Sequence, residues 1–251
     1  MKNTVLRSLL LCFVSLAVTA GLAAAEPAII AKARAYLGSE AALNSVNSLH
    51  FYGTLDLGPN SEVTEPIRVE ILFERPFRQR SVITSERGVE ITVLDDYDAW
   101  QRVNPANDNT RWNLAVLQAA QIKNLRANVW ENLSFFRGLE SVGGRIEDMG
   151  SVTVDGQNCR KLAFVHSPEI IFYRYFNEQT GRLVLTETQR GESIRESGTI
   201  EVAGIKFPKV LTTVSTRPDG STQTVAINFE KVEVNKPAPA GSFEVPLLIS
   251  N

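Results

Sequence analysis

Cysteine, histidine and methionine are scarce in this chain of 251 residues, which has two of each. Cys12 lies within an apolar N-terminal run, so the rest of the chain has a single cysteine, Cys159, and an intramolecular disulfide is excluded once that run is removed. We expect Cys159 to be a half-buried strand residue that behaves as a small hydrophobic side chain, and a reactive free thiol is the alternative.

Catalytic and cofactor-binding motifs are also missing. The sequence has no G-x-S-x-G, no H-E-x-x-H and no P-loop. His50 is expected on the solvated face of a strand and His166 at a strand end, and no nucleophile or orienting acid is paired with either. Asp95, Asp96 and Asp98 lack the offsets of a calcium loop and are interpreted as turn residues. We therefore expect no enzymatic activity, no metal and no cofactor.

The charge balance gives no sign of a polyanionic partner. The formal net charge is −2, from 26 Lys and Arg against 28 Asp and Glu. Binding of nucleic acid or of anionic membrane surfaces requires basic patches, so neither is expected.

The N-terminus is typical of a cleaved export signal. Lys2 and Arg7 form a short basic region, an apolar run follows, and small residues end at Ala25 before Glu26. The run is shorter than the ~20 residues of a membrane-spanning helix. We expect residues 1–25 to be a signal peptide cleaved after Ala25, and the alternative is an uncleaved anchor.

The remaining residues, 26–251, show no linker, repeat or low-complexity block, so we expect one domain. Its first part is predicted to be helical from Glu26 to Val46, with a break at Gly38 and Ser39 as the N-cap of a second short helix. A second helical region is predicted over Thr110–Gly138, where apolar residues recur every three to five positions.

Two-residue alternation predicts that most of the remaining chain is β-structure. Four strands are expected before the second helical region and seven after it, joined by short turns that favour antiparallel pairing. The later strands are predicted at Ile146–Val154, Arg160–His166, Ile170–Phe176, Leu183–Gln189, Ser193–Val202, Lys206–Ser215 and Thr222–Val234. A sheet of about eleven strands must curl, and two amphipathic helical regions are available to cover its apolar face. The expected fold is a mostly β (α+β), curled antiparallel half-barrel with helices as a lid over an apolar cleft.

The order of several segments resembles the LolA/LolB-like periplasmic carriers of outer-membrane lipoproteins, the lipoprotein-sorting family. An N-terminal helix leads into the first strand, and the other similar stretches are Phe73–Arg78, Asp96–Trp100, Asn104–Pro105, Gly204–Pro208 and Phe243–Pro246. The likeness covers nearly the whole chain after the signal, and order and spacing carry it.

This resemblance implies a non-enzymatic periplasmic protein with an open half-barrel, a helical lid and a hydrophobic cavity. The implied cargo is a lipid or a lipoprotein acyl chain moved towards the outer membrane, and the implied partners are an inner-membrane release complex and an outer-membrane acceptor. The alternative is a sensor or interaction module on the same fold, of the envelope-stress type.

The expected cleft residues are apolar side chains on two alternating strands and on the second helical region, together with one tryptophan. They are Leu49, Phe51, Leu55, Leu57, Ile67, Val69, Ile71, Phe73, Trp100, Leu125, Val129 and Leu133.

Arg75 continues the apolar face of its strand. It is either a rim residue with its guanidinium in water, or a latch that donates hydrogen bonds to the C-terminal carbonyls of a lid helix. The resemblance implies the latch.

Overall fold

The computed structural model describes residues 26–246 except 59–64, 107, 109 and 110, so the predicted signal peptide lies outside the described residues. Its elements are α1 (Ala28–Leu37), α2 (Glu40–Asn44), β1 (Ser48–Asp56), β2 (Ile67–Glu74), β3 (Arg78–Ser85), β4 (Gly88–Asp95), β5 (Asp98–Pro105), β6 (Asn113–Val116), α3 (Ala119–Leu133), a 3-10 turn (Leu139–Val142), β7 (Arg145–Val154), β8 (Gln157–Ser167), β9 (Ile170–Asn177), β10 (Leu183–Thr188), β11 (Ser193–Ser197), β12 (Ile200–Val202), β13 (Ile205–Phe207), β14 (Val210–Thr216) and β15 (Thr222–Val234).

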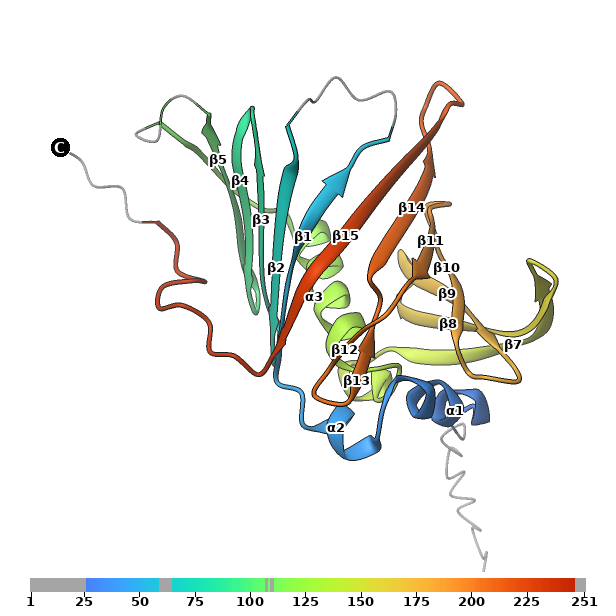
Figure 1. Ribbon diagram of the computed structural model, residues 1–251. Helices are drawn as coiled ribbons and strands as arrows, with labels where there is room; N and C mark the ends of the chain where they lie inside the picture. Colours follow the sequence, from blue (N-terminus) through green and yellow to red (C-terminus); the bar gives the residue numbers. More distant parts are fainter. Residues whose placement is uncertain (1–25, 59–64, 107, 109–110, 247–251) are drawn as a thin grey trace, which may run out of the picture.

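One curled sheet dominates the molecule (Figure 1). Its thirteen strands follow the order β6-β5-β4-β3-β2-β1-β15-β14-β11-β10-β9-β8-β7, and every neighbouring pair is antiparallel. Strands β6 and β7 are its two edges, so the sheet does not close into a barrel. This is the predicted half-barrel, and the count of about eleven strands was close but low.

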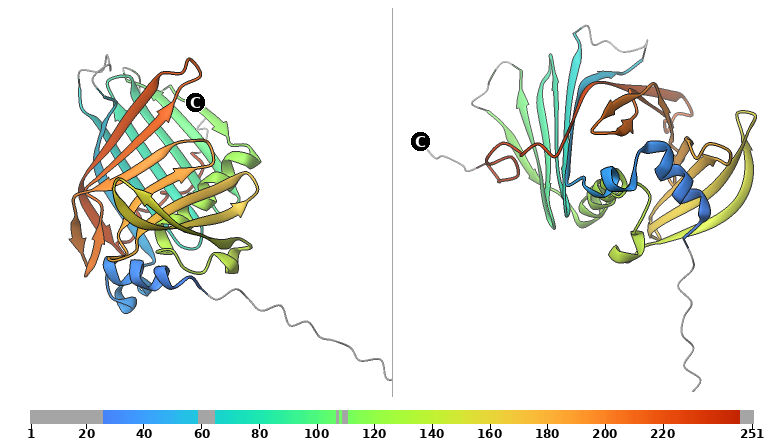
Figure 2. Two further views of the ribbon diagram at one scale, coloured as in Figure 1. Left: turned by 90° about the vertical axis from the view of Figure 1, so that its right-hand side faces the viewer. Right: turned by 60° about the horizontal axis from the view of Figure 1, so that its bottom comes forward.

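The helices lie at the concave side of the sheet (Figure 2). Helix α3 packs on β2, β3 and β4, where Val129 and Leu133 join a core cluster with Leu49 and Phe73. Helix α1 covers the other half of the sheet, with Ile30 in a cluster that includes residues of β8 and β9. The helical lid predicted from the two amphipathic regions is therefore present.

The first helical region matches its prediction in detail. Helix α1 ends at Leu37, and the Oγ of Ser39 accepts a hydrogen bond from the Ala42 backbone N–H at 3.2 Å, as an N-cap of α2 should. Glycine is needed at the break, because a Cβ on Gly38 would lie 2.6 Å from the Gly204 carbonyl oxygen of the hairpin β12–β13.

The second helical region was predicted too long. Helix α3 starts at Ala119, and the preceding residues Asn113–Val116 form strand β6 instead. Leu114, which fitted the helical stripe, pairs with Arg102 of β5. Backbone pairing with β5, which was not predicted as a strand, outweighs the local apolar spacing there.

Two other expected strands are each broken in two. Ser193–Val202 becomes β11 and β12, and Lys206–Ser215 becomes β13 and β14. The two inner pieces form the separate hairpin β12–β13, which leaves the sheet and contacts α1. The hairpin lies at the end of the half-barrel where α1 and α2 also lie (Figure 1).

Candidate functional site

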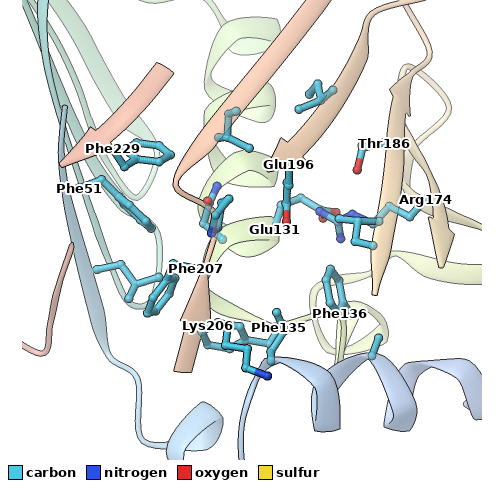
Figure 3. Close-up of a pocket in the computed structure, with 18 of the residues that line it drawn as sticks. Phe51, Glu131, Phe135, Phe136, Arg174, Thr186, Glu196, Lys206, Phe207 and Phe229 are labelled. Atoms are coloured by element: carbon cyan, nitrogen blue, oxygen red, sulfur yellow. The ribbon is translucent and has the colours of Figure 1, made fainter. Parts of the chain in front are cut away.

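A cavity of about 520 Å³ lies between the concave face of the sheet, the helices α1 and α3 and the hairpin β12–β13. That volume is within the usual range for small-molecule and lipid sites. In Figure 3 the rings of Phe51, Phe207 and Phe229 lie on one side of the cavity, and Glu131, Arg174 and Glu196 lie on the other, with Phe136 next to Arg174.

The apolar wall is built on Phe51 of β1. Its ring lies 5.0 Å from that of Phe229, 5.8 Å from that of Phe207 and 6.2 Å from that of Phe73. All four rings line the cavity and come from β1, β2, β13 and β15. Aromatic rings supply a large contact area with two rotatable bonds each, so this wall fits a hydrocarbon chain.

The polar wall comes from β9, β10, β11 and α3. Arg174 and Thr186 are directly opposite each other on β9 and β10, and Glu196 of β11 lies two residues along from Ile194, the partner of Thr186. Glu131 of α3 faces the same group of side chains (Figure 3). Burial raises the pKa of the Glu196 carboxyl, and attraction from Arg174 opposes the shift.

Glu131 is the centre of a buried charged group. One carboxylate oxygen lies 2.5 Å from Nε2 of His166, and the other is in ion-pair contact with Nη2 of Arg174. The three side chains are 5–9% exposed. The Arg174 guanidinium packs against the rings of both Phe136 and Phe164, with its Cζ 4.9 and 4.8 Å from their centroids.

Arg34 joins the three helices. It is 1% exposed, and its Nη1 donates to the carbonyls of Ser134 and Phe135, directly after α3, at 3.1 and 2.9 Å. Its Nε and Nη2 form a bidentate pair with the Glu40 carboxylate at 2.8 and 2.7 Å, and Nη2 also reaches Asn44. The lid is thus fastened by charged hydrogen bonds as well as by apolar contact.

Arg75 reaches the lid from the sheet. Its Nη2 donates to the Leu133 carbonyl, at the last residue of α3, at 2.5 Å, and its Nε donates to the Val46 carbonyl at 2.9 Å. Burial lowers the pKa of Arg75, since the guanidinium is partly removed from water. The guanidinium lies at a helix C-terminus, where a latch was expected to act.

Four of the predicted cleft residues, Leu49, Phe51, Ile71 and Phe73, line the cavity. The strand register puts Leu55, Ile67 and Val69 on the same face but farther along β1 and β2, outside the cavity lining. Leu57 follows the end of β1 at Asp56 and does not line the cavity.

The predicted apolar stripe of α3 packs between the helix and the sheet. Val129 and Leu133 belong to the core cluster and Leu125 packs against it, and none of the three lines the cavity. The α3 residues that do line it are polar, namely Asn128, Glu131 and Asn132. The cavity lies to the side of α3, because tight packing beneath the helix leaves no space there.

Trp100 was assigned to the wrong face of the sheet. Ala99 and Leu94 pair with each other across β5 and β4 and face the core beneath α3. Trp100 and its partner Val93 follow and precede them by one residue, so they point to the opposite face, as does Arg80, the partner of Val93 on β3. Trp100 therefore packs on the convex side in a separate cluster, against which Phe243 also packs. The C-terminal segment covers this surface, which is why an apolar residue occurs on it.

His50 was expected on a solvated strand face, but its side chain is buried. It is 7% exposed on the convex face, with Nε2 2.7 Å from Glu70 and Nδ1 2.9 Å from the Tyr52 hydroxyl.

Arg34, Arg174 and Glu196 were missed by the sequence analysis. Arg34 follows Ile30 by four residues and so lies on the apolar stripe of α1, a position that could have drawn notice. Arg174 lies in the run Ile170–Phe176, in which all the remaining residues are aliphatic or aromatic. The run therefore has no alternation that would show which face of the sheet Arg174 occupies.

Within the described part of the chain, no group of three or more His, Cys, Asp or Glu side chains is placed to hold a metal ion. No helix of that part is long and apolar enough to cross a bilayer.

Solved structures resemble this chain although sequence comparisons do not find relatives. No family model and no curated protein matches. A LolA superfamily protein from Nitrosomonas europaea aligns with a TM-score of 0.57 at 13% identity, covering 86% of this chain and 96% of that one. A DUF1329 family protein from Desulfovibrio piger aligns at 0.55 and 11%, covering 86% and 96%, and an outer membrane lipoprotein-sorting protein domain from Vibrio parahaemolyticus at 0.53 and 9%, covering 86% and 95%. At these identities the likeness establishes the fold alone, and this chain has a LolA-like fold.

Proposed function

We propose that this protein is a periplasmic carrier that holds a lipid or a lipoprotein acyl chain in its cavity and moves it towards the outer membrane. The observation that carries the proposal is the 520 Å³ cavity between sheet and lid, with an aromatic wall made by Phe51, Phe207 and Phe229. A carrier of this kind would receive its cargo from an inner-membrane release complex and pass it to an outer-membrane acceptor.

The lid supplies the second requirement of a carrier, which is that cargo is shielded in transit and then released. Arg75 and Arg34 both donate to carbonyls at or just after the end of α3, so charged hydrogen bonds add to the apolar contacts that hold α3 to the sheet and to α1. Bonds of this strength, about 1.5–3 kcal/mol each for a charged donor, permit a closed state that can still open.

The test is to purify the protein, extract it with organic solvent and identify bound lipids by mass spectrometry. Leu211 of β14 lines the cavity, whereas its neighbour Val210 pairs with Asn228 on the other face of the sheet, and both are half-buried. Leu211→Asp should therefore lose most of the bound lipid, while the matched control Val210→Asp should keep it.

An alternative is a sensor or interaction module, and the free sheet edge favours it. Val116 of edge strand β6 is 74% exposed, and Tyr97 in the β4–β5 turn is 68% exposed. Exposed apolar side chains beside an unpaired edge are typical of protein-binding surfaces. A protein purified without lipid, with both Asp variants indistinguishable from wild type, would contradict the carrier and favour this alternative.

A further inference from the structure

A hydrocarbon chain makes no hydrogen bonds, so it would leave the groups of the polar wall unpaired. Within the described residues, the Glu196 carboxyl and the Thr186 hydroxyl have no hydrogen-bond partner, and Nε and Nη1 of Arg174 are buried without one. Arg174 is itself 7% exposed. Thr186 is also 7% exposed, whereas Glu196 is half-buried. Buried polar groups in native proteins are paired, so the unpaired donors of Arg174 and Thr186 indicate a ligand group that is absent from the structure.

The free groups have a chemical preference in common. Arg174 can only donate hydrogen bonds, Thr186 can donate one, and Glu196 donates one whenever it is protonated, a form that burial favours by raising its pKa. The ligand atoms that satisfy three donors are acceptors, and a carbonyl oxygen is the simplest such group in a lipid.

The charges of the wall argue against an anionic head group. The positive charge of Arg174 is already matched by the Glu131 carboxylate, and a protonated Glu196 adds no positive charge. The other cations that line the cavity, Arg182 and Lys206, are exposed and therefore screened by water. A carboxylate or phosphate entering this wall would meet no surplus of positive charge.

We propose that the cavity binds the uncharged ester carbonyl of an acylated glycerol against Arg174, Thr186 and Glu196, with the acyl chain along the rings of Phe51, Phe207 and Phe229. This inference rests on the proposed carrier function and names its substrate class. Two sources have this chemistry, a free glycerolipid and the diacylglyceryl group of a lipoprotein. The Arg174 donors are covered by protein, including the ring of Phe136, which also lines the cavity, so we expect that ring to move aside when the ester binds.

The test uses three fluorescent probes with one tail, 10-(1-pyrenyl)decanoic acid, its methyl ester and 1-decylpyrene, titrated into delipidated full-length protein at pH 7.5. We expect the ester to bind at least tenfold more tightly than the ionised acid and than the hydrocarbon. An ester no tighter than the hydrocarbon, or an acid as tight as the ester, would overturn the inference. Failure of all three probes to bind would instead remove the carrier proposal on which it rests.

Variants of the wall separate recognition from folding. Thr186→Val with Glu196→Leu should reduce the ester preference to less than threefold while binding of 1-decylpyrene persists. The matched control is Thr212→Val with Arg195→Leu. These two residues pair with each other and alternate with cavity-lining neighbours, so they face away from the cavity. The control should keep the ester preference. Equal preferences in both variants would show that the polar wall does not select the ligand.

A second pair addresses Arg174. Arg174→Met with Glu131→Leu removes both partners of the ion pair, so that no single charge remains buried. The ester preference should fall at least tenfold in this variant, provided its circular dichroism spectrum and decylpyrene binding match those of wild type. An unchanged preference in such a folded variant would exclude Arg174 from ester recognition.

The two ester sources are distinguished by competition with the bound methyl ester probe. Monooleoylglycerol represents free glycerolipid, and an S-diacylglyceryl-cysteinyl peptide represents a lipoprotein. Oleate, an ionised fatty acid, is the competitor for comparison. Displacement of the probe by either ester compound at a tenth of the concentration that oleate requires supports the ester inference and names the source. Displacement at the lowest concentration by oleate contradicts it.

Discussion

Replacing Arg75 with Leu should loosen the lid without unfolding the sheet. Arg75 connects the end of β2 to the last carbonyl of α3, that of Leu133, and to the Val46 carbonyl outside the lid. Of the two bonds that Arg75 donates, the one to Leu133 joins the sheet to the lid. A hydrogen bond from a charged donor contributes about 1.5–3 kcal/mol, and since about 1.4 kcal/mol corresponds to a factor of ten, the open state should become about ten- to a hundredfold more populated.

Hydrogen exchange measured by mass spectrometry reports this change directly. Amides in the C-terminal half of α3, which are protected in the closed state, should exchange about ten to a hundred times faster in Arg75→Leu, while those of β1 and β2 keep their rates. The control is Arg78→Leu, because Arg78 pairs with Glu74 and Asp95 on the convex face and does not touch the lid. If α3 exchanges at the wild-type rate in Arg75→Leu, the arginine is a rim residue and the latch is refuted.

Four other perturbations have defined outcomes. Arg34→Met leaves two carbonyls after α3 without a donor, at about 1–3 kcal/mol each, so urea denaturation should show a loss of stability of about 2–6 kcal/mol. A loss below about 1 kcal/mol would contradict the central place of Arg34 in the lid. The pKa of Glu196 is raised above its ordinary 4.5, so the folded state holds this proton more tightly than the unfolded chain. The free energy of unfolding should therefore fall as pH rises from 4.5 through the raised value. Glu196→Gln should remove that pH dependence in urea titrations, and an identical pH dependence in the variant would rule out Glu196 as its cause. Phe51→Ala should cost about 3–5 kcal/mol of stability and also weaken binding of 1-decylpyrene, and a folded variant with unchanged affinity would place the ligand elsewhere. Cys159 is fully buried and burial raises the pKa of its thiol, so Ellman's reagent should react only after unfolding, and rapid reaction of the native protein would contradict its buried position.

The parts of the fold that follow strict local patterns were predicted correctly. Alternation in β1 and β2 placed Leu49, Phe51, Ile71 and Phe73 on one face, because side chains of a strand point to opposite faces in turn and one face of this sheet is dry. Ser39 was identified as a cap because few residues satisfy a helix N-terminus.

What the sequence concealed depends on tertiary pairing. Asn113–Val116 has no strand pattern of its own and extends only because β5 offers an edge. Trp100 has the composition expected of a cleft residue, yet its face depends on the register of β4 and β5 and on the C-terminal segment that covers it.

The polar wall could not be assembled from the sequence. Arg174, Thr186 and Glu196 are on three strands, and their meeting depends on the order of β9, β10 and β11 in the sheet. Glu131, which faces them from α3, lies on the helix edge beside the apolar stripe. Such a site is visible only when sheet order and helix placement are both known.

The central claim, that an acyl chain lies between sheet and lid, is tested most directly by contact quenching of tryptophan fluorescence. A cavity reporter is made by Phe207→Trp with Trp100, Trp112 and Trp130 changed to Phe, and a convex-face reporter keeps Trp100 alone. Each is titrated with a 9,10-dibromostearoyl chain supplied as the methyl ester. The account predicts strong quenching at position 207 and none at Trp100, whereas quenching at Trp100 without quenching at position 207 would place the chain on the outside of the sheet and contradict it.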